Sequence, residues 1–562
     1  MRMEVYMAIK RLEIQGYRSI DDMKLDAEQI TAFIGANGSG KTNILSALNL
    51  FYTNLTTEQR EENIYDANNP LRNEVRIRVT YDLKDILKKV QHNQNAEANE
   101  YENYYRKILA IARNDEIILE MTKRKGKRTM WNQDYNIRQI VSFLFPIYVV
   151  DSRQIMLTDW KNLWELIGDL VKLRNEDSAS LQNDIKDKIR DDYQSTNRRL
   201  EHLGKLLKER HIDVKKLTPR QLGEVVAKIA VGGQMFQYGE RSLKEYSNGT
   251  NAYNYTIFLI DILNMLKRYK LKEPVVVLDE PEISLHYLLI DSLLDKIFEI
   301  SDNIQFLIAT HSSRCVKALL ESEEENSSIY HIVLSERYTK IKRVRSLAKE
   351  DARERAVITE AYTNSCFAKM VLNVEGETEL ELFRNKYLKL VFPKLKEVEI
   401  VSGMSNHVIY NLTAPGKRNY QVPGFAVMDM DKVLMKKDGR NRFEFKELKE
   451  DYPIEKEIYH YGKKRRDTLY LRKRIKSMCE KCNFFFRYPF FSCDDRNFNF
   501  LLDIIIEYYE NYCVHLWRNT VEGALITIDN LELFITFTGE SGYPFHFAQM
   551  LAESPFLIKA CK

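Results

Sequence analysis

The 562-residue sequence contains no apolar run long enough to cross a membrane, and its first ten residues lack the continuous apolar segment of a signal peptide. We therefore expect a cytoplasmic protein with no membrane partner. Its seven cysteines are scattered and odd in number, which favours a reducing compartment over a disulfide framework. A net charge of only +4 means that overall charge argues neither for nor against nucleic acid as a partner.

The sequence is rich in apolar residues, 44%, and charged residues, 30%, as in a globular protein with an ample core. Its length corresponds to roughly three or four domains. Basic residues cluster at 123–128, 463–466 and 472–474. Each cluster could neutralise the phosphates of a nucleic acid, although a solvated turn or helix face is the commoner origin of such a run.

One short loop carries the clearest motif. Residues 35–42 read G-x-x-x-x-G-K-T, the phosphate-binding P-loop, between an apolar run at 30–34 and apolar residues at helical spacing over 43–51. Strand, loop and helix form the context that the motif requires, because backbone N–H groups and the helix N-terminus bind phosphate together. Lys41 is expected to reach the β- and γ-phosphates of ATP, and Thr42 to bind Mg²⁺. The residues predicted to bind the nucleotide here are Gly35, Asn37, Gly38, Ser39, Gly40, Lys41, Thr42 and Asn43.

Two later apolar runs each end in a residue suited to ATP hydrolysis. Residues 275–280 read Val-Val-Val-Leu-Asp-Glu, as in a buried parallel strand with functional acids at its C-terminal end. We expect Asp279 to hold Mg²⁺ through water and Glu280 to polarise the attacking water. The run 306–311 ends in His311, which is expected to sense the γ-phosphate. A histidine at a strand end is usually structural, and the order of the three motifs is what favours a functional role here.

The stretches between these motifs predict further elements. Strands are expected at 9–20, at 74–81 with one solvent-facing side, and at 143–151 as a buried strand. Residues 160–229 have a helical, heavily charged pattern with almost no Gly or Pro, which indicates a helical insertion. A hairpin, a short coiled coil and an ordinary helical subdomain all fit that pattern. Charged residues after 321 place a domain boundary between 340 and 368.

Residues 1 to about 340 resemble ABC-type ATPases of the kind found in RecF, SMC and OLD (overcoming lysogenisation defect) proteins. Besides the P-loop, the resemblance rests on the segments 16–20 (Gly-Tyr-Arg-Ser-Ile), 279–282 (Asp-Glu-Pro-Glu), 284–286 (Ser-Leu-His) and 310–312 (Thr-His-Ser). It implies a signature segment that caps the nucleotide of a partner subunit, and therefore a homodimer or higher oligomer. Residues 246–250, with Ser247 and Gly249 as nucleotide contacts, are the candidate, although they depart from the usual Ser-Gly-Gly-Gln. Gln154 is a weak candidate for the Q-loop.

A second set of acids follows the ATPase motifs. A predicted strand at 370–374 leads into Glu375, with Glu379 four residues later, and a strand at 424–429 ends in Asp429 with Asp431 close behind. Alternation in an extended chain would place both aspartates on the same side. Carboxylate oxygens suit Mg²⁺ or Mn²⁺, and two such ions can clamp the attacking and leaving oxygens in phosphodiester cleavage. Each motif alone could also be a surface acidic turn.

These acids resemble the Toprim domain, with its Glu-Gly-x-x-x-Glu and Asp-x-Asp motifs, although Glu379 comes one residue early. The resemblance implies catalytic Glu375, Asp429 and Asp431, and a metal held by these three with Glu379. It further implies a downstream acid and a late lysine, for which Glu522 and Lys559 are the candidates. In OLD-family nucleases a Toprim domain follows an ABC ATPase, which is the order found here.

The remaining C-terminal sequence is less informative. Cys479 and Cys482 form a single C-x-x-C pair, whereas structural zinc needs four ligands. The aromatic run 484–491 could stack on single-stranded bases, but a core strand or an oligomer contact is the commoner origin.

The predicted fold class is α/β: an ABC-type ATPase domain at 1–345 with a helical insertion at about 160–229, a linker at 346–367, and a Toprim nuclease domain with a C-terminal extension at 368–562. The predicted function is an ATP-regulated endonuclease acting on nucleic acid, above all double-stranded DNA, with ATP and Mg²⁺ (or Mn²⁺ at the Toprim site) as cofactors. Resemblance places such proteins in bacterial anti-phage defence, in Gabija-like, PARIS-like or retron-associated systems with a further protein, RNA or DNA partner. The alternative is a non-cleaving RecF- or SMC-like ATPase that clamps DNA or scaffolds a partner protein.

Overall fold

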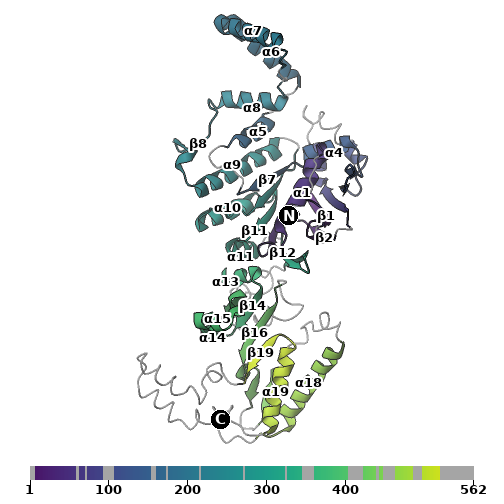
Figure 1. Ribbon diagram of the computed structural model, residues 1–562, viewed down its shortest axis with the longest axis vertical. Coiled ribbons are helices and arrows are strands. Elements are labelled where there is room, and N and C mark those ends of the chain that lie inside the picture. The colour runs from purple at the N-terminus through teal and green to yellow at the C-terminus, as the bar shows by residue number, and fades with distance from the viewer. Residues whose placement is uncertain are drawn as a thin grey trace. The chain divides into compact units, whose positions relative to one another are not determined.

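The computed structural model describes residues 7–58, 63–66, 68–69, 72–92, 107–153, 160–171, 175–213, 217–269, 272–322, 326–344, 360–402, 422–437, 442–446, 462–484 and 496–518. The chain divides into two compact units (Figure 1). Unit 1 comprises Met1–Leu319 with Glu324–Arg343, and unit 2 comprises Leu320–Glu323 with Val344–Lys562. Within the described ranges, every helix is too short or too polar to span a lipid bilayer.

The P-loop sheet of unit 1 is built from the apolar runs of the sequence. Within the described residues its strand order is β13-β12-β3-β11-β10-β7. The strands are β3 (Ile30–Ile34), β7 (Ile147–Asp151), β10 (Val275–Asp279), β11 (Gln305–Thr310), β12 (Ser327–Ser335) and β13 (Tyr338–Val344). Those from β12 to β7 pair in parallel. Since β3, β10 and β11 are buried along their whole length, each is an almost continuous apolar run in the sequence.

This strand order determines where the predicted ATPase residues meet. Strand β11 lies between β3 and β10, with Thr310 beside Ile34 and Ala309 beside Asp279. Parallel neighbours end at the same edge of a sheet, so the P-loop, the acids after β10 and the histidine after β11 emerge together. Segments more than 200 residues apart in the chain, such as Ile34 and Asp279, thus share one edge.

A second sheet of unit 1 is antiparallel, with the order β2-β1-β4-β5-β6 in the described residues. Its strands are β1 (Ile9–Tyr17), β2 (Ile20–Asp26), β4 (Glu74–Asp82), β5 (Glu116–Arg124) and β6 (Met130–Trp131). Buried and partly exposed residues alternate through most of β4, which confirms the predicted strand with one solvent-facing side. Helix α1 (Lys41–Thr56) contacts strands of both sheets and joins them in one hydrophobic core.

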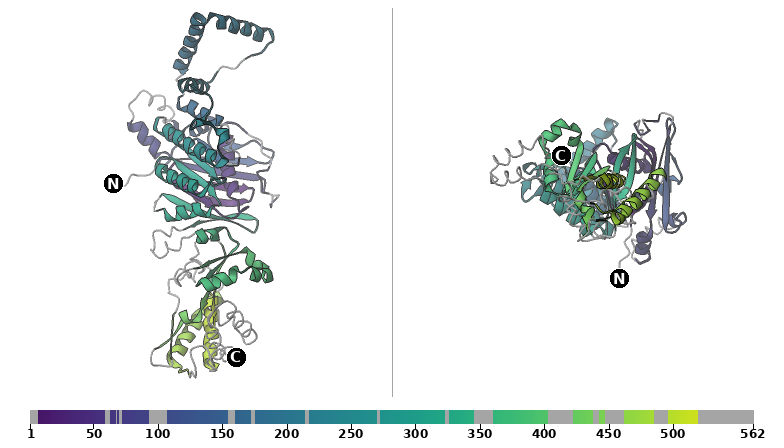
Figure 2. Two further views of the ribbon diagram at one scale, coloured as in Figure 1. Left: turned by 90° about the vertical axis from the view of Figure 1, so that its left-hand side faces the viewer. Right: turned by 90° about the horizontal axis from the view of Figure 1, so that it is seen from below.

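The other helices of unit 1 flank these sheets and fill the stretch predicted as an insertion. Helices α9 and α10 lie side by side against the P-loop sheet (Figures 1 and 2). Of the insertion helices, α5 packs against α8 and α9, and α6 contacts α7 and α8. None of the residues of α7 is buried. The helices are α2 (Lys84–His92), α4 (Tyr135–Leu144), α5 (Lys161–Leu170), α6 (Asn175–Asp192), α7 (Gln194–Glu209), α8 (Pro219–Ala230), α9 (Asn248–Tyr269), α10 (Tyr287–Ile300) and α11 (Ser313–Glu321).

The predicted buried strand at 143–151 is wrong in its first half and in its burial. Residues up to Leu144 belong to α4, which begins at the N-cap Asp134, whose side chain accepts a hydrogen bond from the N–H of Ile137. Pro146 then separates the helix from β7, because proline disfavours helical backbone in the residue before it. Strand β7 lies at one end of the strand order, and only Val150 within it is buried.

Unit 2 contains a parallel sheet with the order β15-β14-β16-β19 in the described residues. Helices α18 and α19 pack against each other over a core that includes Ile475 and Leu501. The elements are β14 (Met370–Val374), β15 (Val398–Ser402), β16 (Gly424–Asp429), β17 (Leu434–Lys436), β18 (Phe443–Phe445), β19 (Val514–Trp517), α13 (Glu360–Asn364), α14 (Glu377–Arg384), α15 (Lys386–Val391), α18 (Gly462–Lys481) and α19 (Arg496–Glu510).

The prediction that Asp429 and Asp431 share one side of an extended strand is wrong. Strand β16 ends at Asp429, and the chain then turns into the 3-10 helix Met430–Lys432. Asp429 is half-buried at the strand end, whereas Asp431 is exposed on the helical turn. The alternation that places residues i and i+2 together holds only while the backbone stays extended.

Candidate functional site

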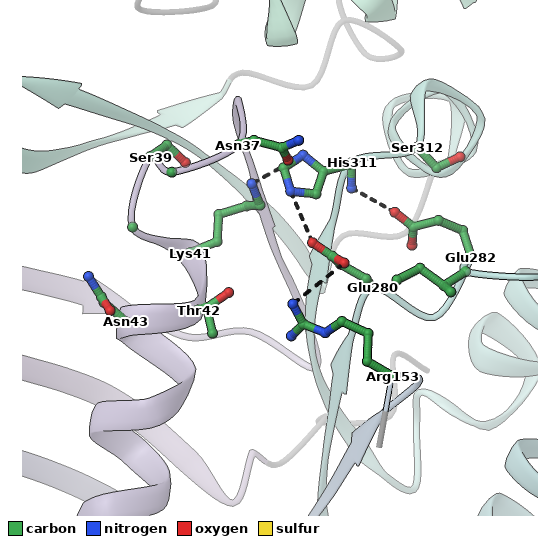
Figure 3. Close-up of a pocket in the computed structure, with 13 residues that line it drawn as sticks. Asn37, Ser39, Lys41, Thr42, Asn43, Arg153, Glu280, Glu282, His311 and Ser312 are labelled. Carbon is green, nitrogen blue, oxygen red and sulfur yellow. Dashed lines mark hydrogen bonds and ion pairs between the residues drawn. The ribbon is translucent and has the colours of Figure 1, made fainter. Parts of the chain in front are cut away.

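The sheet edge of unit 1 opens into a pocket of about 640 Å³ (Figure 3). Most of the predicted nucleotide-binding residues line it, together with the predicted catalytic residues Glu280 and His311. Gly35 and Asp279 lie just outside the lining, at the ends of their strands. The lining residues are Asn37, Gly38, Ser39, Gly40, Lys41, Thr42, Asn43, Arg153, Glu280, Glu282, Ile283, His311 and Ser312.

Two glycines let the P-loop pass close to neighbouring strands. A Cβ on Gly35, whose φ is 152°, would lie 2.1 Å from the carbonyl oxygen of Ile332, and one on Gly40, whose φ is 108°, would lie 2.2 Å from Thr339 Oγ1. Any larger residue would push the loop away from β12 and β13. Asn43 is held by the segment before β2, because its Nδ2 donates to Ser19 Oγ at 2.8 Å and its Oδ1 accepts from Arg18 at 3.3 Å.

Lys41 is buried and already surrounded by acceptors. Its Nζ donates to the carbonyl oxygens of Gly35 at 2.7 Å and Ala36 at 3.2 Å, and lies 3.3 Å from His311 Nδ1. Burial lowers the pKa of Lys41 to about 8, although the carboxylates of Glu280, Asp279 and Glu282 oppose that shift. A phosphate group placed in this loop would favour the charged form, so phosphate binding and lysine protonation support each other.

Glu280 points into the pocket from the end of β10. Its Oε1 lies 3.1 Å from His311 Nε2, and its backbone adopts a left-handed φ of 52° while the N–H donates to the Ala309 carbonyl at 2.8 Å. Burial lowers the pKa of His311, which favours a neutral imidazole between Lys41 and Glu280. Strain of this kind is concentrated at functional sites, and here it aims a carboxylate at the space above the P-loop.

Glu282 has a positioning role that the sequence did not indicate. Its Oε1 accepts from the N–H of His311 at 2.7 Å and from Thr310 Oγ1 at 2.9 Å. Burial raises the pKa of Glu282, and these hydrogen bonds counteract the shift. The carboxylate therefore fixes the turn after β11 and with it the direction of the His311 ring.

Arg153 is a pocket residue that we did not predict from the sequence. It follows β7, and its guanidinium reaches Asp279 Oδ2 at 2.5 Å and Glu280 Oε2 at 3.8 Å. Its own backbone N–H and Nε both donate to Asp151 Oδ1. The signal available in the sequence was a charged residue directly after a strand, but its pairing with β10 depends on the strand order.

The residues of this pocket fit a Mg²⁺ ion. Asp279 is 5% exposed, and its Oδ1 is a buried acceptor with no hydrogen-bond donor in the described part of the chain. Burial raises the pKa of Asp279, and the guanidinium of Arg153 opposes that shift. Thr42 contributes a hydroxyl in the first turn of α1. Thr42 and Asp279 would hold the ion, which supplies charge neutralisation for the phosphates.

A family model supports this description of the site. Residues 7–316, more than half of the chain, match the model described as AAA ATPase domain. The chain belongs to this AAA ATPase domain family. The predicted ATPase is thereby confirmed, with ATP as its nucleotide, and the matched residues contain the P-loop, the acids after β10 and His311.

Solved structures similar to this AAA ATPase domain include two SMC heads and RecF. The SmcHead bound to the C-winged helix domain of ScpA is 17% identical, with 61% of this chain and 98% of that chain covered and a TM-score of 0.38. The SMC head domain from Thermotoga maritima is 16% identical, with 60% and 100% covered and a TM-score of 0.32. The recombination mediator protein RecF with ATP is 14% identical, with 61% and 100% covered and a TM-score of 0.33. Similarities this low leave function to be argued from this chain's own residues.

The signature candidate lies outside the pocket of its own chain. Ser247 and Asn248 are exposed at the start of α9, whereas Gly249 is buried, and a Cβ there would lie 2.2 Å from the carbonyl oxygen of Ser284. None of the three lines the pocket. The segment is therefore packed against the loop that follows Glu280, with its two polar residues facing solvent.

In unit 2 the structure brings together two of the predicted metal ligands. Glu375 follows β14, and Asp429 is the last residue of β16, the parallel neighbour of β14. The N–H of Asp429 donates to Glu375 Oε2 at 3.5 Å. Lys432 Nζ lies 3.2 Å from Glu375 Oε1, and this hydrogen bond raises the pKa of Lys432. Glu379 is buried and its Oε2 accepts from the N–H of Gly376, so it caps α14. Lys432 was not predicted from the sequence.

The described residues do not complete a metal site at this edge. Among them, no three His, Cys, Asp or Glu side chains are arranged to hold a metal ion. Cys479 and Cys482 are free thiols, and they form no such group with other described residues. Three predicted residues lie outside the described part of the chain: Gln154, Glu522 and Lys559. The aromatic run lies outside it too, except for Phe484, whose side chain is buried in the unit 2 core.

Proposed function

We propose that this chain is an ATP-regulated, metal-dependent endonuclease, with nucleotide hydrolysis in unit 1 and nucleic-acid cleavage at the carboxyl edge of the unit 2 sheet. The observation that carries the proposal is the pairing of Glu375 with Asp429 at the ends of β14 and β16. Functional acids of parallel α/β sheets gather at this edge. The order of an ATPase followed by these acids resembles OLD-family nucleases, from which we also infer the role in anti-phage defence.

Helix α18 supports nucleic acid as the substrate. It carries nine Lys or Arg residues against two Asp or Glu residues. Leu471, Ile475 and Cys479 face the core, whereas Lys473 and Arg474 are exposed. A helix with such an excess of cations attracts the phosphate backbone of DNA or RNA without reading its sequence. We propose double-stranded DNA as the substrate, since each subunit of a dimer would bring one such edge to a duplex.

The test is cleavage of plasmid DNA in Mg²⁺ or Mn²⁺, with and without ATP. Glu375→Ala and Asp429→Ala should each lower the cleavage rate by at least about 100-fold while leaving ATP hydrolysis unchanged, because the two sites use different residues. Glu377→Ala, an exposed neighbour on α14, is the matched control and should cleave at the wild-type rate. Cleavage by Glu375→Ala at the wild-type rate in both metals would exclude this site.

A second candidate function is a non-cleaving ATPase that clamps DNA or scaffolds a partner protein. The ion pair between Lys432 and Glu375 favours it, because an ammonium already satisfies a carboxylate that a metal would need. If the protein has this function, the wild-type protein should bind DNA with an affinity that depends on ATP. The bound DNA should remain uncut in both Mg²⁺ and Mn²⁺. Reversing the charge of Lys473 and Arg474 would then abolish DNA binding by a protein that does not cleave DNA even as wild type.

A further inference from the structure

One guanidinium contacts the carboxylates at the ends of β7 and β10, beside the ATPase pocket. Arg153 Nη2 donates to Asp279 Oδ2 at 2.5 Å, and Nη1 lies 3.8 Å from Glu280 Oε2. Nε donates to Asp151 Oδ1 at 2.9 Å. Arg153 thus contacts three carboxylates from the ends of two neighbouring strands. Without it, their mutual repulsion and their repulsion of a triphosphate would oppose nucleotide entry.

The position of Arg153 suits a cation that a metal ion can displace from Asp279. Its side chain is 44% exposed, while that of Asp279 is 7% exposed, so the guanidinium reaches from solvent onto a buried acid. In Figure 3 its head group points toward Glu280, with Thr42 across the pocket. Asp279 Oδ1 has no donor in the described part of the chain. Arg153 therefore contacts one oxygen of Asp279, and the described residues leave the other oxygen available to a metal ion.

We propose that Arg153 is a resident counter-ion of the ATPase site, which substitutes for part of the Mg²⁺ charge and competes with Mg²⁺ for Asp279. Two cations on one carboxylate repel each other, so each weakens the binding of the other. The guanidinium lets nucleotide enter before the metal and sets the Mg²⁺ concentration at which the metal-bound state takes over. The inference concerns the ATPase site and is independent of nuclease activity in unit 2.

The proposal predicts opposite effects of Arg153→Gln in the absence and presence of metal. Glutamine keeps a long polar side chain but removes the charge. Affinity for a fluorescent, non-hydrolysable ATP analogue should fall on the order of tenfold in EDTA, because the carboxylates then face the phosphates unshielded. The Mg²⁺ concentration for half-maximal tightening should fall by on the order of tenfold, because Mg²⁺ no longer competes with a guanidinium. Equilibrium fluorescence titration measures both quantities without turnover.

Two further variants separate charge from structure. Arg153→Lys keeps the charge and should retain a Mg²⁺ requirement near that of wild type. Arg314→Gln removes a different arginine from unit 1, one that pairs with Asp291 at 2.6 Å outside the pocket, and should leave both quantities unchanged. Should Arg153 only brace β7 against β10, Arg153→Gln would weaken binding equally in EDTA and in Mg²⁺, with an unchanged Mg²⁺ requirement. That result, or a higher requirement, would overturn the proposal.

Discussion

Glu280 is held between His311, 3.1 Å away, and Arg153, 3.8 Å away, in a backbone conformation that few non-glycine residues adopt. The contacts of this carboxylate orient it, and its negative charge would polarise a water molecule. Replacing Glu280 by an uncharged side chain of the same shape therefore separates the role of its shape from the role of its charge.

Glu280→Gln should bind ATP with near wild-type affinity and release phosphate about 100-fold more slowly, because an amide fills the same space but does not accept the proton. Nucleotide titration and a phosphate-release assay measure the two effects. Glu377→Ala in unit 2 is a control that should alter neither. Wild-type turnover by Glu280→Gln would assign the catalytic role to another residue.

At the scale of elements, the start of α9 and the loop after β10 are coupled through Gly249. A Cβ on residue 249 would lie only 2.2 Å from the carbonyl oxygen of Ser284. Ser284 itself has a left-handed φ of 66°, so the loop has little freedom to retreat. The signature candidate and the loop after β10 are consequently close-packed within a subunit, with no space for a side chain at residue 249.

Gly249→Ala should destabilise the protein by about 1–3 kcal/mol, because the new methyl group is forced into backbone at a close-packed contact. Gly204→Ala on α7 is the matched control: apart from the helix itself, no described residue lies within 4 Å of its Cβ position, and alanine there should stabilise the helix by up to about 1 kcal/mol. Thermal unfolding measures both. Equal melting temperatures for the two variants would contradict the packing that we describe.

At the scale of the whole molecule, the chain carries one P-loop, one acidic strand and one signature candidate. Since Ser247 and Asn248 are exposed and do not line the pocket of their own chain, we propose that they cap the nucleotide of a second copy. A two-fold dimer would then contain two composite sites, each with residues from both subunits.

Mixing Lys41→Ala with Ser247→Arg subunits should restore about one quarter of wild-type ATP hydrolysis, because half of randomly paired dimers keep one of two composite sites intact. Each variant alone should be inactive. Ser247 is preferred to Gly249 for this test because it is exposed, whereas Gly249 packs inside its own subunit. No recovery in verified mixed dimers, or full activity from a monomer in sedimentation, would rule out the arrangement.

The sequence by itself was sufficient where the chemistry is local. The P-loop is a run of eight consecutive residues between a buried strand and a helix, and β10 and β11 are continuous apolar runs because both faces of a central parallel strand are covered. Glu375 and Asp429 could also be predicted from the sequence, since each comes directly after a short, mostly apolar run.

Only the tertiary structure decided which side chains meet across the sheet. Arg153 reaches an aspartate 126 residues away because β7 pairs with β10, and no local pattern encodes that pairing. Lys432 reaches Glu375 and Asp431 turns away because the backbone leaves the extended conformation after Asp429. Strand neighbours and the conformation beyond a strand end depend on packing of distant segments, which is why a linear sequence leaves both undetermined.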